Sequence, residues 1–247
     1  MKQISRDVNV KPPPLTTLTL FGYSSVSAKV WAFAQMGLAN FDLGKTSGLQ
    51  FWKLLGTGNG GGFSLNPNWS RYGLLAVWET PEAADDFFDK SKLMQKYRRR
   101  ADEIWTVKML PTRAHGLWSG TNPFPSLAEK KADAPVAVLT RAKIHWNKLH
   151  RFWSFVPSTS RELSAARNLI ASIGIGEAPF VRQATFSLWQ SEDDVQNFAY
   201  KSPVHREVVK LTRQEKWYSE DLFARFTPIA SEGNWNGRNP LAGLLND

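Results

Sequence analysis

Histidine is the side chain through which this sequence could hold a metal or move a proton, and it occurs four times, as His115, His145, His150 and His205. The sequence contains 0 Cys, which rules out disulfides, zinc ribbons, iron–sulfur clusters and thiolate-ligated haem. His145 and His150 lie roughly 140° apart around a helix, so they could not chelate one metal from the same helical face. No GxSxG, HExxH or paired-carboxylate spacing is present.

Two glycine patterns resemble phosphate-binding loops, but neither has the surroundings that such a loop requires. Ala39-x4-Gly44-Lys45-Thr46 follows an aromatic helical stretch, whereas a phosphate loop follows a buried strand. The pattern GTGNGG at residues 56–61 is not followed by the helix on which a dinucleotide pyrophosphate would bind. The glycine-rich loop at residues 56–62 is therefore expected to be either an ordinary long hairpin or a lid at the mouth of a pocket.

The composition describes a basic, aromatic-rich globular chain. Its 247 residues are 42% hydrophobic and include 11 Trp and 15 Phe, which excludes a disordered chain and indicates a hydrophobic ligand site or an amphipathic surface. The net charge of +9 could serve an anionic cofactor, an acidic partner, a membrane surface or solubility. The basic run KYRRR at residues 96–100 is typical of a solvated helix face, so we expect no nucleic-acid partner.

The sequence also indicates where the protein is located. No apolar run approaches the roughly 20 residues of a membrane-spanning helix. The first 14 residues lack the apolar core of a signal peptide. We therefore expect a cytoplasmic protein, with peripheral contact with the inner membrane as an option.

The chain is predicted to be a tandem duplication. RYGLLAVWETPEAADDFFDKS at residues 71–91 aligns with RQATFSLWQSEDDVQNFAYKS at residues 182–202 at a constant offset of 111, which pairs Trp78 with Trp189. PTRAHGLWSGTNPF at residues 111–124 aligns with PIASEGNWNGRNPL at residues 228–241 at an offset of 117. Tryptophans that coincide in two separate blocks are strong evidence for two related units.

Each unit is predicted to have the order β-α-β-β-α-β of a ferredoxin-like split βαβ fold. We expect strands at residues 16–23, 50–58, 71–78 and 104–111, and again at 135–144, 169–176, 182–189 and 221–228. Helices are expected at residues 30–37, after the cap Thr80 and at 94–103, and again at 148–155, after the cap Ser191 and at 204–218.

Two such units in one chain usually pack sheet against sheet as an α+β barrel. The predicted organisation is a flexible arm at residues 1–14, a first repeat at 15–118, a polar linker at 119–133, a second repeat at 134–235 and a C-terminal tail at 236–247.

Three segments carry a resemblance to a known family: residues 51–78 (FWKLLGTGNGGGFSLNPNWSRYGLLAVW), 111–124, and 198–226 (FAYKSPVHREVVKLTRQEKWYSEDLFARF). They resemble spheroidene monooxygenase and its relatives, the bacterial carotenoid ketolases. The resemblance implies a haem b monooxygenase that oxidises a carotenoid end-group CH2 to a ketone, with O2 and electrons from a ferredoxin-like donor. It also implies the dimeric α+β barrel fold of chlorite dismutases, dye-decolourising peroxidases and aldoxime dehydratases, and with it a homodimer.

The resemblance indicates which of the four histidines is the best candidate for a haem ligand. In related haem barrels the proximal histidine lies on a helix of the C-terminal unit, and His205 fits this description because Pro203 places it early on a helix. His205, which falls opposite Met94 of the first repeat, is therefore the predicted axial ligand of the haem iron, and the second repeat is the predicted haem-binding unit. The candidates for the haem propionates, each of which could instead be a surface charge, are Arg182, Arg206, Arg213 and Arg225.

The distal and substrate sides are less well defined by the sequence. His115 aligns with Glu232 after a last strand, so it is a candidate either for a pocket or for a turn, and Trp189 and Trp217 are further pocket candidates. A slot for a polyene would be lined by aromatic side chains, each of which could equally be core, such as Trp31, Phe33, Trp153, Phe155, Trp189 and Trp217.

Two other functions stay open at this point. The same fold could carry a different haem reaction, of the aldoxime dehydratase or peroxidase kind, or it could form a haem-free binding protein. A visible absorption spectrum separates the haem-free alternative from the others, and dependence of turnover on O2 and a reductant separates the haem reactions.

Overall fold

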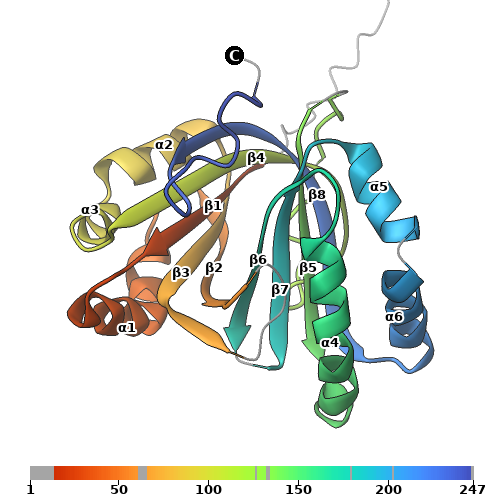
Figure 1. Cartoon of the computed structure of the whole chain (residues 1–247). Helices are drawn as coiled ribbons and strands as arrows, with labels where there is room; N and C mark the ends of the chain where they lie inside the picture. The colour runs from red at the N-terminus through yellow and green to blue at the C-terminus, as the bar shows by residue number, and fades with distance from the viewer. Residues whose placement is uncertain are drawn as a thin grey trace, which may run out of the picture.

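The computed structural model describes residues 14–60, 66–125, 127–131, 134–178, 180–201 and 203–245, without the side chains of residues 200, 201 and 203–205. Two βαββαβ units follow one another along the chain (Figure 1). The first consists of β1 (Leu15–Gly22), α1 (Val26–Leu43), β2 (Leu49–Gly58), β3 (Pro67–Trp78), α2 (Pro81–Lys90), α3 (Lys92–Arg98) and β4 (Glu103–Gly116). The second consists of β5 (Val136–Ile144), a short 3-10 helix (Trp146–Lys148), α4 (Leu149–Ser164), β6 (Leu169–Ala178), β7 (Arg182–Trp189), α5 (Glu192–Lys201), α6 (Pro203–Gln214) and β8 (Tyr218–Gly233). The predicted ferredoxin-like repeat and α+β class are confirmed.

The strands of both units form one closed antiparallel barrel in the order β1-β3-β2-β6-β7-β5-β8-β4. The two sheets therefore join along their edges, at two seams of unequal length. β4 and β8 pair from Trp105↔Gly233 to Gly116↔Leu222. Among the described residues, β2 and β6 pair only through Gly56↔Gly176 and Thr57↔Ile175. The second seam is thus the weaker closure of the barrel.

The barrel interior is a packed core. Inward-facing side chains of all eight described strands, together with Trp118 and Trp235 from the turns after β4 and β8, belong to one buried cluster. The helices lie outside, with α1, α2 and α3 over one half of the barrel and α4, α5 and α6 over the other (Figure 1). Because the interior is filled with side chains, a large cofactor has to bind outside the barrel wall.

The shared glycine motif at the end of each unit marks a close approach of two strands. Gly116 has φ +90°, and a Cβ there would lie 2.2 Å from a backbone oxygen of β8. Gly233 has φ +75°, and a Cβ there would lie 2.0 Å from a backbone oxygen of β4. Glu220 then accepts hydrogen bonds from the backbone N–H groups of the turn after Gly116, and Glu103 does the same after Gly233. Only glycine fits these two positions, which explains why both repeats carry it.

Several helix limits differ from the sequence-based prediction. α1 is longer than predicted and begins after the N-cap Ser25, and α4 continues through Pro157. α3 ends at Arg98 and α6 at Gln214, shorter than predicted, and Lys216 in the left-handed region (φ 51°) leads from α6 into β8. The predicted cap Thr80 is confirmed, since its hydroxyl accepts from the Ala83 N–H at 3.2 Å.

Part of the expected organisation lies outside the described residues. This applies to residues 1–13 of the predicted arm and to residues 61–65 of the glycine-rich loop, which β2 and β3 flank as an antiparallel pair. The lid therefore stays a prediction. Across the described residues, no helix combines the length and the apolar character needed to cross a bilayer.

Candidate cofactor site

The two units differ in how their helices cover the outer face of the sheet. In the first unit, 16 of the described side chains are buried, apolar and part of one continuous cluster between the sheet and α1, α2 and α3. In the second unit, the described buried apolar side chains form two separate clusters, one around Trp217 and one around Trp189. Between these two clusters lies a strip of the sheet that no buried cluster of described side chains covers, and we call it the uncovered strip.

Thr140 marks the uncovered strip. It lies in the middle of β5, between Val138 of the Trp189 cluster and Ala142 of the Trp217 cluster, and it is exposed. Its counterpart is Thr19 on β1, which occupies the same place in the strand pairings of the first unit. Thr19 is 0% exposed and shares a 3.0 Å hydroxyl–hydroxyl hydrogen bond with Thr106. The same backbone position is therefore covered in one repeat and open in the other.

A row of cross-strand neighbours extends from Thr140 over four strands. Thr185 on β7 pairs with Thr140, Thr140 pairs with Phe223 on β8, and Phe223 pairs with His115 on β4. The His115 ring stacks on the Phe223 ring, with 5.2 Å between centroids and 26° between planes. His115 is exposed and Phe223 is half-buried. The row thus presents hydroxyl, aromatic and imidazole groups outward.

A pair of arginines lies in the adjacent row. Arg225 on β8 pairs across the strands with Arg113 on β4, and its guanidinium lies 5.3 Å from the Phe223 ring centroid. Arg225 also forms an ion pair with Glu192 at the start of α5. Its Nε is buried and has no hydrogen-bond partner among the described residues. Burial first, and the charge of Arg113 second, lower the pKa of Arg225. Two neighbouring guanidinium groups with an unused donor favour a bound anion.

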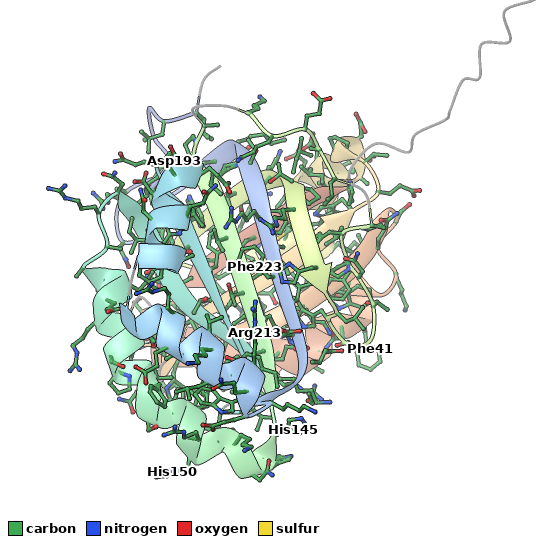
Figure 2. All side chains as sticks on the ribbon, turned by 90° about the vertical axis from the view of Figure 1, so that its right-hand side faces the viewer. Phe41, His145, His150, Asp193, Arg213 and Phe223 are labelled. Carbon is green, nitrogen blue, oxygen red and sulfur yellow. The ribbon has the colours of Figure 1, made fainter. Side chains whose placement is uncertain are left out.

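α5 and α6 bridge the uncovered strip. Val195 and Phe198 of α5 belong to the Trp189 cluster, whereas Val208 and Leu211 of α6 pack on the Trp217 cluster. The junction between the two helices therefore lies over the strip. Figure 2 shows this side of the molecule, with α6 in front of the sheet that carries Phe223.

The structure brings some of the predicted site residues together. His115 lies on the uncovered strip, Arg225 lies buried in the row beside it, and Arg206 and Arg213 are exposed on α6. His205 lies in the first turn of α6, and its side chain is outside the described set. Arg182 is exposed at the start of β7, opposite Lys143, and so lies away from the strip.

The two tryptophans proposed for the pocket lie in the flanking clusters. Trp189 is 2% exposed, and its Nε1 donates to the Ser187 hydroxyl at 2.9 Å. Trp217 is 0% exposed, and its Nε1 donates to Glu215 at 2.8 Å. Both rings therefore anchor helices on either side of the uncovered strip.

Sequence reasoning missed Arg113, Thr140 and Phe223. The signal that could have found them is the change between repeats at outward-facing strand positions. Leu74 of the first unit corresponds to Thr185 of the second, in the alignment of offset 111. Phe21 corresponds in the same way to Ala142. Bulky apolar side chains that hold helices on the first sheet become smaller or polar on the second.

A separate cavity of about 210 Å³ lies at the weak β2–β6 seam. Phe33 of α1, Trp69 of β3 and Phe180 of the β6–β7 turn are among its lining residues, and most of the lining is apolar. It is distinct from the uncovered strip, because none of the strip residues lines it.

The fold and the uncovered strip define an α+β barrel of two fused ferredoxin-like units with a candidate cofactor site on the second. Comparison with known proteins makes this more specific. The chain is 36% identical over 234 residues to spheroidene monooxygenase of Rhodobacter capsulatus, covering 94% of this chain and 97% of that protein. It is 38% identical over 217 residues to spheroidene monooxygenase of Rubrivivax gelatinosus, covering 86% and 81%. The chain belongs to the spheroidene monooxygenase family and is therefore a monooxygenase, an oxidoreductase.

Solved structures support the fold independently. A crystal structure of aldoxime dehydratase in complex with butyraldoxime matches with a TM-score of 0.58 at 9% identity, covering 94% of this chain and 85% of that one. At this identity the likeness concerns the fold alone. No protein-family model matches the chain.

Proposed function

We propose that this protein is a haem-dependent monooxygenase that oxidises a CH2 group of a hydrophobic substrate, a carotenoid end group, to a ketone with O2 and external electrons. The observation that carries the proposal is the uncovered strip on the second sheet, which faces the helix with His205 and adjoins the Arg113–Arg225 pair. Membership of the spheroidene monooxygenase family supports the reaction and the substrate class.

The residues at the strip fit the chemistry of haem b. Its two propionates are carboxylates, which the Arg113–Arg225 pair and the unused Arg225 Nε would bind. Its iron would bind a histidine nitrogen, which His205 would provide from α6. The half-buried Phe223 offers apolar surface to a macrocycle.

The internal repeat supports the choice of residue 205 as the ligand. Met94 holds the equivalent position on α3 of the first unit. Its side chain is 1% exposed and packs between that helix and the sheet. Residue 205 holds on α6 the place in the repeat that Met94 holds on α3. A methionine that fills a core in one repeat would thus correspond to a ligand in the other.

Haem b and the residues of the site would have different roles in the reaction. When bound, haem b would supply the activation of O2 that C–H oxidation requires. Arg113 and Arg225 would fix the orientation of the macrocycle through its propionates. The ring nitrogens of His115, which is exposed and held flat against Phe223, and the Thr140 hydroxyl would donate or accept hydrogen bonds on the sheet side.

The proposal also includes the electron donor of the protein, its oligomeric state and its location. A ferredoxin-like donor with an acidic surface would suit a chain of net charge +9. A cytoplasmic location and a homodimer remain part of the proposal.

The proposal is tested by the visible absorption spectrum of protein supplied with haem. We expect a Soret band in the wild type, its loss in His205→Ala, and an unchanged circular dichroism spectrum in that variant. His150→Ala, on the exposed surface of α4, is the matched control and keeps the band. The absence of a Soret band in the wild type would contradict haem dependence. Full haem content in the His205→Ala variant would show that another residue binds the iron.

Turnover separates the monooxygenase from other haem reactions. With a carotenoid substrate and a reductant, we expect O2 uptake and a carbonyl product. Turnover without O2 or reductant would instead indicate chemistry of the aldoxime dehydratase kind.

A further inference from the structure

α1 is apolar on both of its faces. One face packs on the first sheet through Ala32, Ala39 and Leu43. The opposite face is exposed to solvent, yet its large side chains are apolar and between 57% and 77% exposed, namely Val26, Val30, Phe33, Leu38 and Phe41. No charged residue occurs between Lys29 and Asp42. An unbroken apolar stripe of this length on a solvent face marks a surface that binds something.

The stripe continues onto neighbouring elements. Trp69 of β3 is 57% exposed and contacts the Phe33 ring edge-on, with 5.6 Å between centroids. Phe180, on the β6–β7 turn, is 45% exposed. Phe33, Trp69 and Phe180 all line the cavity at the β2–β6 seam, so this cavity adjoins the apolar surface.

A cluster of cations borders the stripe on its other side. The Arg100 guanidinium lies 4.6 Å from the Trp31 ring centroid, and Lys96 Nζ lies 3.6 Å from an Asp42 carboxylate oxygen. These contacts fix α3 and the residues after it beside α1, as Figure 1 also shows. Exposed basic side chains on this segment are Lys92, Lys96, Arg98, Arg99 and Arg100.

We propose that the surface formed by the α1 stripe, Trp69 and the α3 cations docks on an anionic phospholipid bilayer. α1, with 18 residues, is about 27 Å long and would lie in the plane of the interface. Its apolar side chains would enter the acyl boundary while the cations bind headgroup phosphates. Trp69 suits this level of a bilayer because its ring has an apolar body and a polar N–H.

The positive charge of this surface favours a bilayer over a second copy of the chain as its binding partner. A second copy of the chain would bring its own α3 cations and its own net positive charge to the interface. This would add repulsion to a chain that already carries a net charge of +9. An anionic lipid surface complements the same cations.

The docked orientation would place the mouth of the seam cavity at the lipid surface. A lipophilic molecule dissolved in the bilayer could then reach the cavity without crossing water. The inference rests on α1 and α3, and it does not depend on the proposed haem site, which lies on the other half of the barrel (Figure 1).

The test is flotation of the full chain with vesicles of phosphatidylcholine alone and of equimolar phosphatidylcholine and phosphatidylglycerol. We expect binding to the anionic vesicles that weakens when salt is added. Phe41→Asp should lower the partition coefficient at least about tenfold, because a charge replaces an apolar side chain at the acyl boundary. Leu244→Asp, the same charge change at another exposed apolar residue in the C-terminal tail, should bind as the wild type does.

Three outcomes would overturn the inference. They are no flotation of the wild type, equal flotation of Phe41→Asp and wild type, and sedimentation that shows a wild-type dimer which Phe41→Asp dissociates. Phe41 is 74% exposed, so the variant should fold, and an unchanged unfolding midpoint verifies this. Both variants should keep the haem content of the wild type, so a failure of the haem proposal is measured separately.

Discussion

One substitution made at two equivalent positions tests the difference between the repeats directly. Thr19 and Thr140 occupy the same place in the strand pairings of their units, but Thr19 is fully buried and Thr140 is exposed. We expect Thr19→Phe to destabilise the protein and Thr140→Phe to leave its stability almost unchanged. The second variant should instead obstruct the uncovered strip.

The expected magnitudes follow from the two environments. At Thr19 the larger ring would overpack a filled core, which costs about 1–3 kcal/mol. It would also remove the hydrogen bond to the Thr106 hydroxyl, which costs about another 1 kcal/mol. In total, Thr19→Phe should lower the free energy of unfolding by roughly 2–4 kcal/mol and Tm by roughly 4–16 °C. At Thr140 there is open space, so the change should stay within about 0.5 kcal/mol.

Urea denaturation measures the free energies, and titration with haem followed at the Soret band measures the affinity. Thr140→Phe should weaken haem binding by at least about tenfold, which corresponds to about 1.4 kcal/mol of lost binding free energy. Equal destabilisation by the two variants would refute the argument, because it would mean that the second sheet is covered as closely as the first. Unchanged haem affinity in a stable Thr140→Phe variant would place the cofactor elsewhere.

Two further predictions concern buried charge on the second unit. Glu192→Leu should destabilise the protein by about 3 kcal/mol in urea denaturation, because it leaves the buried Arg225 charge next to Arg113 without its carboxylate partner; equal stability of variant and wild type would contradict this. Although burial acts to raise the pKa of the Glu220 carboxyl, hydrogen bonds from the Gly120 N–H, the Arg141 guanidinium and the Ser119 N–H outweigh it and lower that pKa below 4.5. The stabilisation from Glu220 is therefore present above pH 4.5 and lost as pH falls through the lowered pKa, so Glu220→Gln should be less stable than the wild type at pH 7 and approach it in acid; a constant difference in unfolding free energy from pH 7 to pH 3 would contradict the assignment.

The duplication made the fold predictable from the sequence. Apolar alternation in the strands and the Thr80 cap are local signals, and the second copy of each signal reduced the ambiguity of the first. The ends of α3 and α6 were not predictable in the same way. The residues after Arg98 and Gln214 are good helix formers, and the helices stop there because β4 and β8 must begin in register with β1 and β5.

The candidate site was only partly predictable, because its residues come from strands that are distant in sequence. The resemblance to haem enzymes pointed to His205 and to Arg225, which the structure places on α6 and in the row beside the uncovered strip. Arg113 gave no local signal, since it looks like an ordinary surface charge until the long β4–β8 seam brings it beside Arg225. Barrel closure, a tertiary event, creates that pair.

The asymmetry between the repeats is difficult to explain by stability alone. Ancestral symmetry would allow the second sheet to be covered as the first is, and bulkier apolar residues at positions such as Ala142 and Thr185 would bury more surface. Instead, the second unit leaves Thr140 exposed between two separate clusters and places a buried arginine with an unused donor in the adjacent row. A protein that carries an uncovered face and a buried charged group with one unpaired donor gives up stability that a ligand at that face restores. The residues that cost stability are therefore those that a bound anionic, flat and largely apolar cofactor would satisfy together.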